Sequence, residues 1–172
     1  MNPIAACSIR RAIPDDAEVV MRSIDTICAE GGAFYITHFI PTPQWQAVLY
    51  QPTTVPQHLL VVAEWEGQFL GAGRLFRGES HTLLRHVAEL GLFVLKPYRG
   101  HGIGRALLTW MINWASTVGI EKITLDVFAT NRPAIHLYHQ LGFVEEGCQQ
   151  RQIKVGDHYI DRLWMALFLQ QG

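Results

Sequence analysis

The chain has 172 residues with a formal net charge of −1, and 49% of its residues are hydrophobic. This length suits one folded unit with a core of its own, so we expect residues 1–172 to form a single domain. The near-neutral charge gives no reason to expect a nucleic acid or an anionic membrane surface as a partner. No segment is long and apolar enough to span a bilayer, and the first residues lack the apolar centre of a secretory signal.

The three cysteines, Cys7, Cys28 and Cys148, are scattered along the chain without the spacing of a metal site. His136 and His139 are one helical turn apart, but no third ligand accompanies them, so we expect no metal. Isolated cysteines in odd number favour free thiols in a reducing compartment. We therefore expect a cytoplasmic protein.

The N-terminal half alternates apolar runs with turn residues. Pro14 is followed by two acidic residues, which favours a helix start, and Gly31 and Gly32 favour its end. Thr42 and Pro43 predict a second helix start. These signals predict, in chain order, a strand at residues 7–13, the two helices, and a hairpin of strands at residues 58–65 and 68–76 around Glu66 and Gly67.

The middle of the chain indicates a strand, a glycine-rich turn and a helix. The apolar run at residues 92–95 is bounded by Pro97, which favours a buried strand. From Ile103 onward, apolar residues recur at steps of three and four, the period of a helix with one buried face. Trp110 and Trp114 fall on this pattern and are expected in the core.

The remaining elements follow at regular intervals. We expect a strand at residues 122–128, a helix at 132–141 closed by Gly142, and a last hairpin with strands at 144–153 and 158–169. The expected order of elements is therefore β-α-α-β-β-β-α-β-α-β-β, which describes a mixed α/β fold.

The glycine-rich turn has the features of an anion site. The start of a helix leaves backbone N–H groups without partners, and its dipole is positive there. Glycines let a ligand approach the backbone, and Arg99 and Arg105 add positive charge on either side. The alternative is a tight strand-to-helix connection with glycines for steric reasons alone. Three alternating glycines between two arginines favour a phosphate or pyrophosphate.

The spacing of the glycines argues against two common phosphate ligands. Gly100, Gly102 and Gly104 form G-x-G-x-G, whereas a dinucleotide turn has the pattern G-x-G-x-x-G. An ATP or GTP loop requires a Lys followed by Ser or Thr after its glycines, and this turn has neither.

The pattern Arg99-x-x-Gly102-x-Gly104 resembles the acetyl-CoA motif of the GNAT superfamily, the GCN5-related N-acetyltransferases. Downstream, Asn131, Ala134, Tyr138 and the pair Gly142-Phe143 are similar to the second signature of that family. The resemblance is strong over residues 89–146. It implies a GNAT fold, with a mixed, mostly antiparallel central sheet flanked by helices, and acetyl-CoA as cofactor with CoA as product.

The resemblance also assigns the cofactor contacts. Main-chain groups of the central strand would bind the carbonyl oxygen and the pantetheine amides, and the turn would bind the pyrophosphate. Asn131, which would also cap its helix, would reach the pantetheine arm. The implied cofactor residues are Phe93, Val94, Leu95, Arg99, Gly100, His101, Gly102, Ile103, Gly104, Arg105, Asn131, Ala134 and Tyr138, with His101 contributing its backbone.

Two side chains are expected to act in the reaction that the resemblance implies. An amine acceptor is mostly protonated at pH 7, so a base helps, and Glu89 matches the base glutamate of histone-type members. A partly buried Glu89 would suit this role; alternatively it pairs with Arg85 or His86, and the base is His86 or water. Tyr138 matches the tyrosine that donates a proton to the leaving thiolate, against the alternative of a core aromatic residue.

The acceptor is the least specified part. In the family, the loop between the first two helices and the last hairpin, here residues 31–43 and 149–160, form its groove. Phe34, Tyr35 and Phe39 offer apolar walls, and acidic residues that could attract an amine are Glu30, Glu89, Asp157 and Asp161.

The last hairpin resembles bacterial members that act on small amines, amino acids or protein amino groups. We expect a small-molecule amine or amino acid, with a protein N-terminal or lysine amine, or a non-catalytic acyl-CoA sensor, as alternatives. Exposed C-terminal strand edges favour a homodimer. The sequence leaves open the identity of the acceptor, the acyl-chain preference and the oligomeric state.

Overall fold

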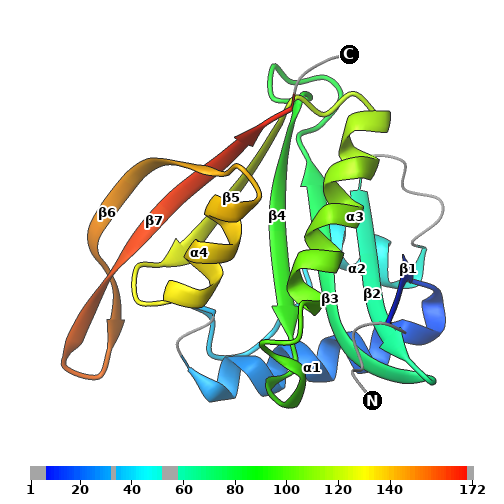
Figure 1. The fold of residues 1–172 in the computed structure, drawn as a ribbon, viewed down its shortest axis with the longest axis horizontal. Helices are drawn as coiled ribbons and strands as arrows, with labels where there is room; N and C mark the ends of the chain where they lie inside the picture. Colours follow the sequence, from blue (N-terminus) through cyan, green and yellow to red (C-terminus); the bar gives the residue numbers. More distant parts are fainter. Residues whose placement is uncertain (1–6, 32–33, 52–57, 170–172) are drawn as a thin grey trace.

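A computed structural model describes residues 7–31, 34–51 and 58–169. One seven-stranded sheet runs through these residues in the order β1-β2-β3-β4-β5-β7-β6, and helices cover both faces (Figure 1). The predicted order of elements is confirmed. The elements are β1 (Ser8–Arg11), α1 (Ala17–Glu30), α2 (Pro43–Tyr50), β2 (His58–Trp65), β3 (Gln68–Arg77), β4 (Val87–Val94), α3 (Ile103–Thr117), β5 (Lys122–Phe128), α4 (Arg132–Gln140), β6 (Val144–Val155) and β7 (His158–Phe168).

The helix starts follow the predicted signals. A short 3₁₀ turn, Pro14–Asp16, precedes α1, which ends at Gly31 with a positive φ of 67°. Gly32, the second half of the predicted stop, lies outside the described residues. Thr42 caps α2 by accepting a hydrogen bond from the Trp45 backbone N–H at 3.4 Å, and Pro43 occupies the first turn.

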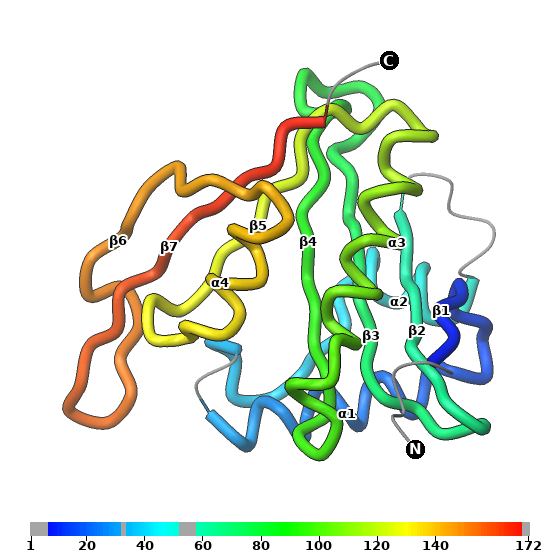
Figure 2. The backbone as a smooth tube through the Cα atoms, viewed as in Figure 1, coloured from blue at the N-terminus to red at the C-terminus, as the bar shows by residue number. Residues whose placement is uncertain are grey.

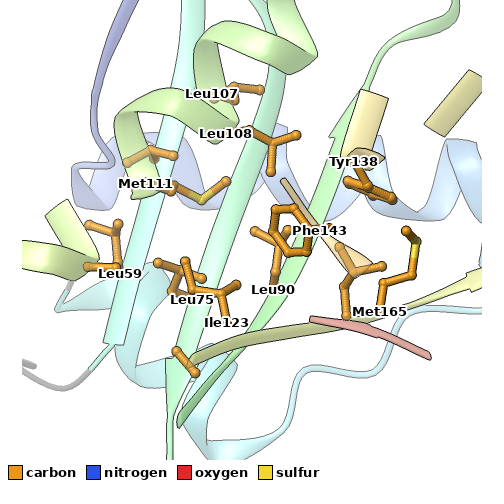
Figure 3. Close-up of a cluster of buried hydrophobic side chains, with 14 of the residues drawn as sticks. Leu59, Leu75, Leu90, Leu107, Leu108, Met111, Ile123, Tyr138, Phe143 and Met165 are labelled. Atoms are coloured by element: carbon orange, nitrogen blue, oxygen red, sulfur yellow. The ribbon is translucent and has the colours of Figure 1, made fainter. Parts of the chain in front are cut away.

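The sheet separates two core layers. Alternate residues of β2 enter opposite layers, because successive side chains of a strand point to opposite faces: Leu59 and Val61 pack with α3 and α4, and Leu60 and Val62 pack with α1 and α2. Figure 3 shows part of the first layer, including Leu107 and Met111 of α3. The prediction for Trp110 and Trp114 needs correction, because both are only half-buried and flank this layer.

Strands β4 and β5 diverge, and this divergence positions the site. They pair in parallel over only three residue pairs, from Val87 opposite Lys122 to Glu89 opposite Thr124. Beyond Glu89, the rest of β4 pairs with β3 alone. Figures 1 and 2 show β4 and β5 running apart toward the ends that carry the start of α3 and of α4. A gap therefore opens in the middle of the sheet.

The last hairpin extends beyond the body of the sheet (Figure 1). Most of β6 is exposed, and its register with β7 shifts between Gln149 and Ile153. Within this irregular stretch Arg151 adopts a positive φ of 54°, and its backbone N–H donates to Asp161 Oδ1 at 2.7 Å. Asp161, one of the acids predicted to attract an amine, therefore already accepts a hydrogen bond from the hairpin's own backbone.

Candidate active site

The glycine-rich turn has the geometry of an anion site. Gly102 caps the start of α3 with φ of 81°, a left-handed conformation that side chains rarely adopt. The first N–H groups of the helix have no intrahelical partner, as at any helix start. At Gly104, a Cβ atom would come within 3.3 Å of Leu137 of α4. The glycines thus serve both the helix start and the close approach of α4.

Arg99 is less free than the sequence suggested. Its Nε donates to the carbonyl oxygen of Val94 at 2.8 Å, and its Nη2 lies 2.7 Å from Glu30 Oε2. Arg99 therefore ties the turn to β4 and α1, and Glu30 is not a free acid for an amine. The His101 ring nitrogen Nδ1 lies 2.8 Å from the carbonyl oxygen of Arg99.

A cleft of about 1080 Å³ extends from this turn along β4 to the loop between α1 and α2. Of the predicted cofactor, catalytic and apolar-wall residues, all except Leu95 and His101 line it: Phe34, Tyr35, Phe39, Glu89, Phe93, Val94, Arg99, Gly100, Gly102, Ile103, Gly104, Arg105, Asn131, Ala134 and Tyr138. The predicted acids Glu30, Asp157 and Asp161 do not line it. His86, the alternative base, does not line it. The structure thus brings together the two signatures and the predicted apolar walls.

The main-chain assignment in β4 needs correction. The Leu95 N–H donates to Leu70, and its carbonyl accepts from Tyr98, so its backbone is already used. Hydrogen-bonded pairs in an antiparallel ladder recur at every second residue, which places Phe93, opposite Ala72, in the ladder with β3. Leu92 and Val94 therefore direct their backbone N–H groups into the gap, and of these two only Val94 was predicted. Phe93 still lines the cleft.

Tyr138 lies at the wall of the cleft, packed against Phe143 with ring centroids 5.6 Å apart (Figure 3). Burial, and to a lesser extent the negative charge of Asp126, raises the pKa of Tyr138 to about 12. Within the described residues, its hydroxyl has no hydrogen-bond partner. Asn131 caps α4 by accepting from the Ala134 N–H at 3.4 Å. Tyr138 therefore offers a protonated hydroxyl to which no described residue is hydrogen-bonded.

Glu89 lies where β4 and β5 begin to diverge, but its surroundings differ from the prediction. Its side chain is 51% exposed, so it is only half buried, and its Oε1 lies 2.6 Å from Nη2 of Arg74. The pairing with Arg85 or His86 that the sequence allowed is replaced by this ion pair from β3. Glu89 and Tyr138 come from opposite faces of the sheet, and the gap between β4 and β5 lets both line one cleft.

Two arginines near Glu89 and Tyr35, namely Arg74 and Arg162, were assigned no role from the sequence. Besides Arg74, Asp126 lines the cleft, and its Oδ2 lies 2.9 Å from Nε of Arg162, with both side chains mostly buried. The Arg162 guanidinium lies 4.8 Å from the centre of the Tyr35 ring, and its Nη2 lies 3.4 Å from the Tyr35 hydroxyl. This contact joins the loop after α1 to β7. The sequence did contain a signal that could have identified Arg74 as a functional residue, because it is the one charged residue in the apolar segment from residue 69 to 76.

These features define a class of protein. The unpaired edge of β4 offers backbone groups that can bind amides, and the glycine turn at the start of α3 offers N–H groups that can bind a phosphate. An extended ligand with amides along its length and a phosphate at one end therefore fits the cleft. Among the described residues, no group of three or more His, Cys, Asp or Glu side chains could hold a metal ion. No helix in that part of the chain is long and apolar enough to cross a membrane.

Comparison with known proteins identifies the family. The acetyltransferase (GNAT) family matches residues 26–143. The N-acetyltransferase YjgM of Escherichia coli, itself uncharacterized, is 30% identical over 148 residues, or 83% of this chain and 86% of YjgM. The L-amino acid N-acetyltransferase AaaT of E. coli is 34% identical over 85 residues, or 47% of this chain, so the match spans about half the length of AaaT (51%).

A solved structure shows the same fold. The acetyltransferase yncA of Salmonella typhimurium, determined with its cofactor acetyl-CoA, has a TM-score of 0.85 and 20% identity, covering 96% of this chain and 95% of that one. The chain belongs to the acetyltransferase (GNAT) family. The superfamily and the fold expected from the two signatures are confirmed.

Proposed function

We propose that the protein transfers the acetyl group of acetyl-CoA to the primary amine of a small molecule or amino acid. The observation that carries the proposal is the gap beside β4, which joins the glycine turn, Tyr138 and Glu89 in one cleft. The acetyl-CoA of the yncA structure and the amino-acid substrates in the name of AaaT support it.

The cofactor would lie along the unpaired edge of β4. The pyrophosphate binds at the N–H groups after Gly102, where the helix dipole favours negative charge. The pantetheine amides bond to the backbone of Leu92 and Val94, which extends β4 on its open side. The N–H groups in the gap are also fixed donors for the carbonyl oxygen as it becomes negative.

The acceptor ammonium first loses one proton to solvent and becomes a neutral amine. From there the reaction needs one further proton removed and one hydrogen bond supplied. The amine attacks the thioester carbonyl, and Glu89, directly or through water, takes a proton from the amine. The C–S bond then breaks and the electron pair remains on the CoA sulfur. Because the pKa of Tyr138, about 12, exceeds that of a thiol, near 8.5, the hydroxyl stays protonated and stabilises the thiolate chiefly as a hydrogen-bond donor.

Titration calorimetry with acetyl-CoA, CoA and ATP tests the cofactor, and release of free CoA with a panel of amines tests the transfer. We expect binding of acetyl-CoA and CoA but not ATP, and thiol release that depends on the amine. A folded sample that ignores acetyl-CoA would overturn the proposal. Binding without thiol release, for small amines, peptide N-termini and lysine peptides alike, would instead support a non-catalytic acyl-CoA sensor.

A further inference from the structure

The guanidinium of Arg74 is held in a fixed position beside the cleft. It lies 4.3 Å from the centre of the Phe76 ring and 5.5 Å from that of Trp45. Gly91, its partner across the β3–β4 ladder, makes room for it, because a Cβ atom there would come within 2.9 Å of Arg74 Nε. The side chain is only 17% exposed. Such a group is pre-organised to bind a planar anion.

The hydrogen bonds of this guanidinium are incomplete. Its Nη2 is paired with Glu89 Oε1 at 2.6 Å, but its Nη1 is buried without a hydrogen-bond partner among the described residues. A buried donor without a partner is unfavourable and is uncommon in native proteins. Glu89 uses only one of the two terminal nitrogens, whereas a carboxylate bound in bidentate geometry would use both.

The position of the pair suggests where such a carboxylate comes from. A second, smaller cleft of about 420 Å³ adjoins the large one, and Trp45, Arg74 and Glu89 line both. A ligand that enters either cleft therefore meets Arg74. Another arginine nearby, Arg162, is already paired with Asp126 and contacts the Tyr35 hydroxyl, whereas Arg74 has a buried nitrogen, Nη1, without a partner among the described residues.

We propose that Arg74 binds the carboxylate of an amino-acid acceptor, and that this carboxylate displaces Glu89 and so releases it to act on the amine. The inference rests on the proposed function. Glu89 is half exposed, so it can rotate away from Arg74 at little cost. Once released, it is no longer neutralised by the guanidinium and can accept the proton of the attacking amine. The acceptor thus activates its own base, and an amine without a carboxylate leaves the ion pair intact.

The first experiment compares substrates on the unaltered protein and needs no variant. CoA release is followed with a panel of L-amino acids, each beside its amide, and the best amino acid is also compared with its decarboxylated amine. The amide has a less basic amine, so chemistry alone favours the amide. We expect kcat/KM for the amino acid to exceed that for either analogue by at least about 30-fold, with part of the difference in kcat.

The second experiment removes the guanidinium. Arg74→Gln should lower kcat/KM for the amino acid by at least about 30-fold, and leave that for the decarboxylated amine unchanged or higher, since Glu89 is then free. Arg74→Lys should retain only part of the native kcat/KM for the amino acid, because an ammonium does not bind in bidentate geometry. The matched control is Arg85→Gln, an exposed arginine of the loop before β4, which should change neither substrate.

The outcomes separate this inference from the proposed function. If amino acids and carboxylate-free amines are acetylated with equal kcat/KM, the proposed role of Arg74 is wrong, whereas acetyl transfer stands. The same holds if Arg74→Gln leaves the ratio of these two kcat/KM values unchanged. If acetyl-CoA does not bind and no amine is acetylated, the proposed function itself fails. Should Arg74→Gln not fold, the substrate series decides alone; amides that match their amino acids there would overturn the inference.

Discussion

The two ends of the cleft are built in different ways: the cofactor end is the part at the glycine turn, and the acceptor end is the part around Arg74 and Glu89. At the cofactor end, the groups offered to a ligand are backbone N–H groups of β4 and of the start of α3, held by Gly102 and by local hydrogen bonds. At the acceptor end, they are charged side chains from β3, β4, β5 and β7, paired with one another across the sheet. Backbone N–H groups are present whatever the side chains are, whereas a side-chain site changes with single substitutions.

The largest effect should come from breaking the cofactor end. Gly102→Glu places a side chain and a negative charge at the phosphate position and strains a residue with φ of 81°, so acetyl-CoA affinity should fall by at least about 1000-fold in calorimetry. Gly119→Glu is the matched control, because Gly119 also has a positive φ, of 73°, but does not line the cleft. Equal losses in both variants would point to misfolding rather than to an anion site.

Changing the acceptor end should leave cofactor binding intact. Glu89→Gln should lower kcat by about 100-fold because the base is lost, while the affinity for acetyl-CoA, measured by calorimetry, stays the same. Since the amide no longer holds Arg74 as an ion pair, KM for an amino acid should stay equal or fall. A variant with full kcat would assign the base to water or to another group.

Tyr138 lies between the two ends and should affect chemistry without binding. Tyr138→Phe removes the hydrogen bond to the leaving sulfur, so kcat should fall by about 30-fold at saturating substrates. Acetyl-CoA affinity should be unchanged. Single-turnover kinetics provides the measurement, because slow product release could otherwise hide the effect; an unchanged rate of the chemical step would leave Tyr138 as a core aromatic residue.

The same residue gives a prediction about stability. The pKa of Tyr138 is raised from 10.0 to about 12 in the folded protein, so the native state holds this proton more tightly than the unfolded chain does. Its contribution is complete below pH 10 and is lost as the pH rises from 10 toward 12. Urea unfolding across this range should show a loss of about 2 kcal/mol in the native protein that Tyr138→Phe lacks.

The smallest effect should come from the link between the turn and α1. Glu30→Gln removes the ion pair with Arg99, which is 42% exposed, so acetyl-CoA affinity should change by only about threefold. Glu18→Gln, which breaks the exposed pair with Arg22 on the same helix, is the control without effect on the cofactor. A loss of tenfold or more for Glu30→Gln would show that the cofactor end also depends on side-chain pairing.

Much of the cofactor end could be read from the chain because its signals are local. The glycine spacing, the Asn131 cap and the apolar period of α3 lie within a short stretch, and each is decided by backbone conformation near its own residues. The error there was one of register. Phe93, Val94 and Leu95 were expected to face the cofactor through their backbones, but strand pairing with β3 directs Leu92 and Val94 into the gap, so the expectation holds at Val94 alone.

The sequence by itself determined the order of elements, the anion turn and the residue types that a transfer of this kind needs. Only the tertiary structure decided which charges meet. Arg74 and Glu89 are 15 residues apart, and Asp126 and Arg162 are 36 apart, so their pairing depends on the register of strands and on where β4 and β5 diverge. The energy of a side-chain ion pair depends on distance and burial, and neither is encoded locally.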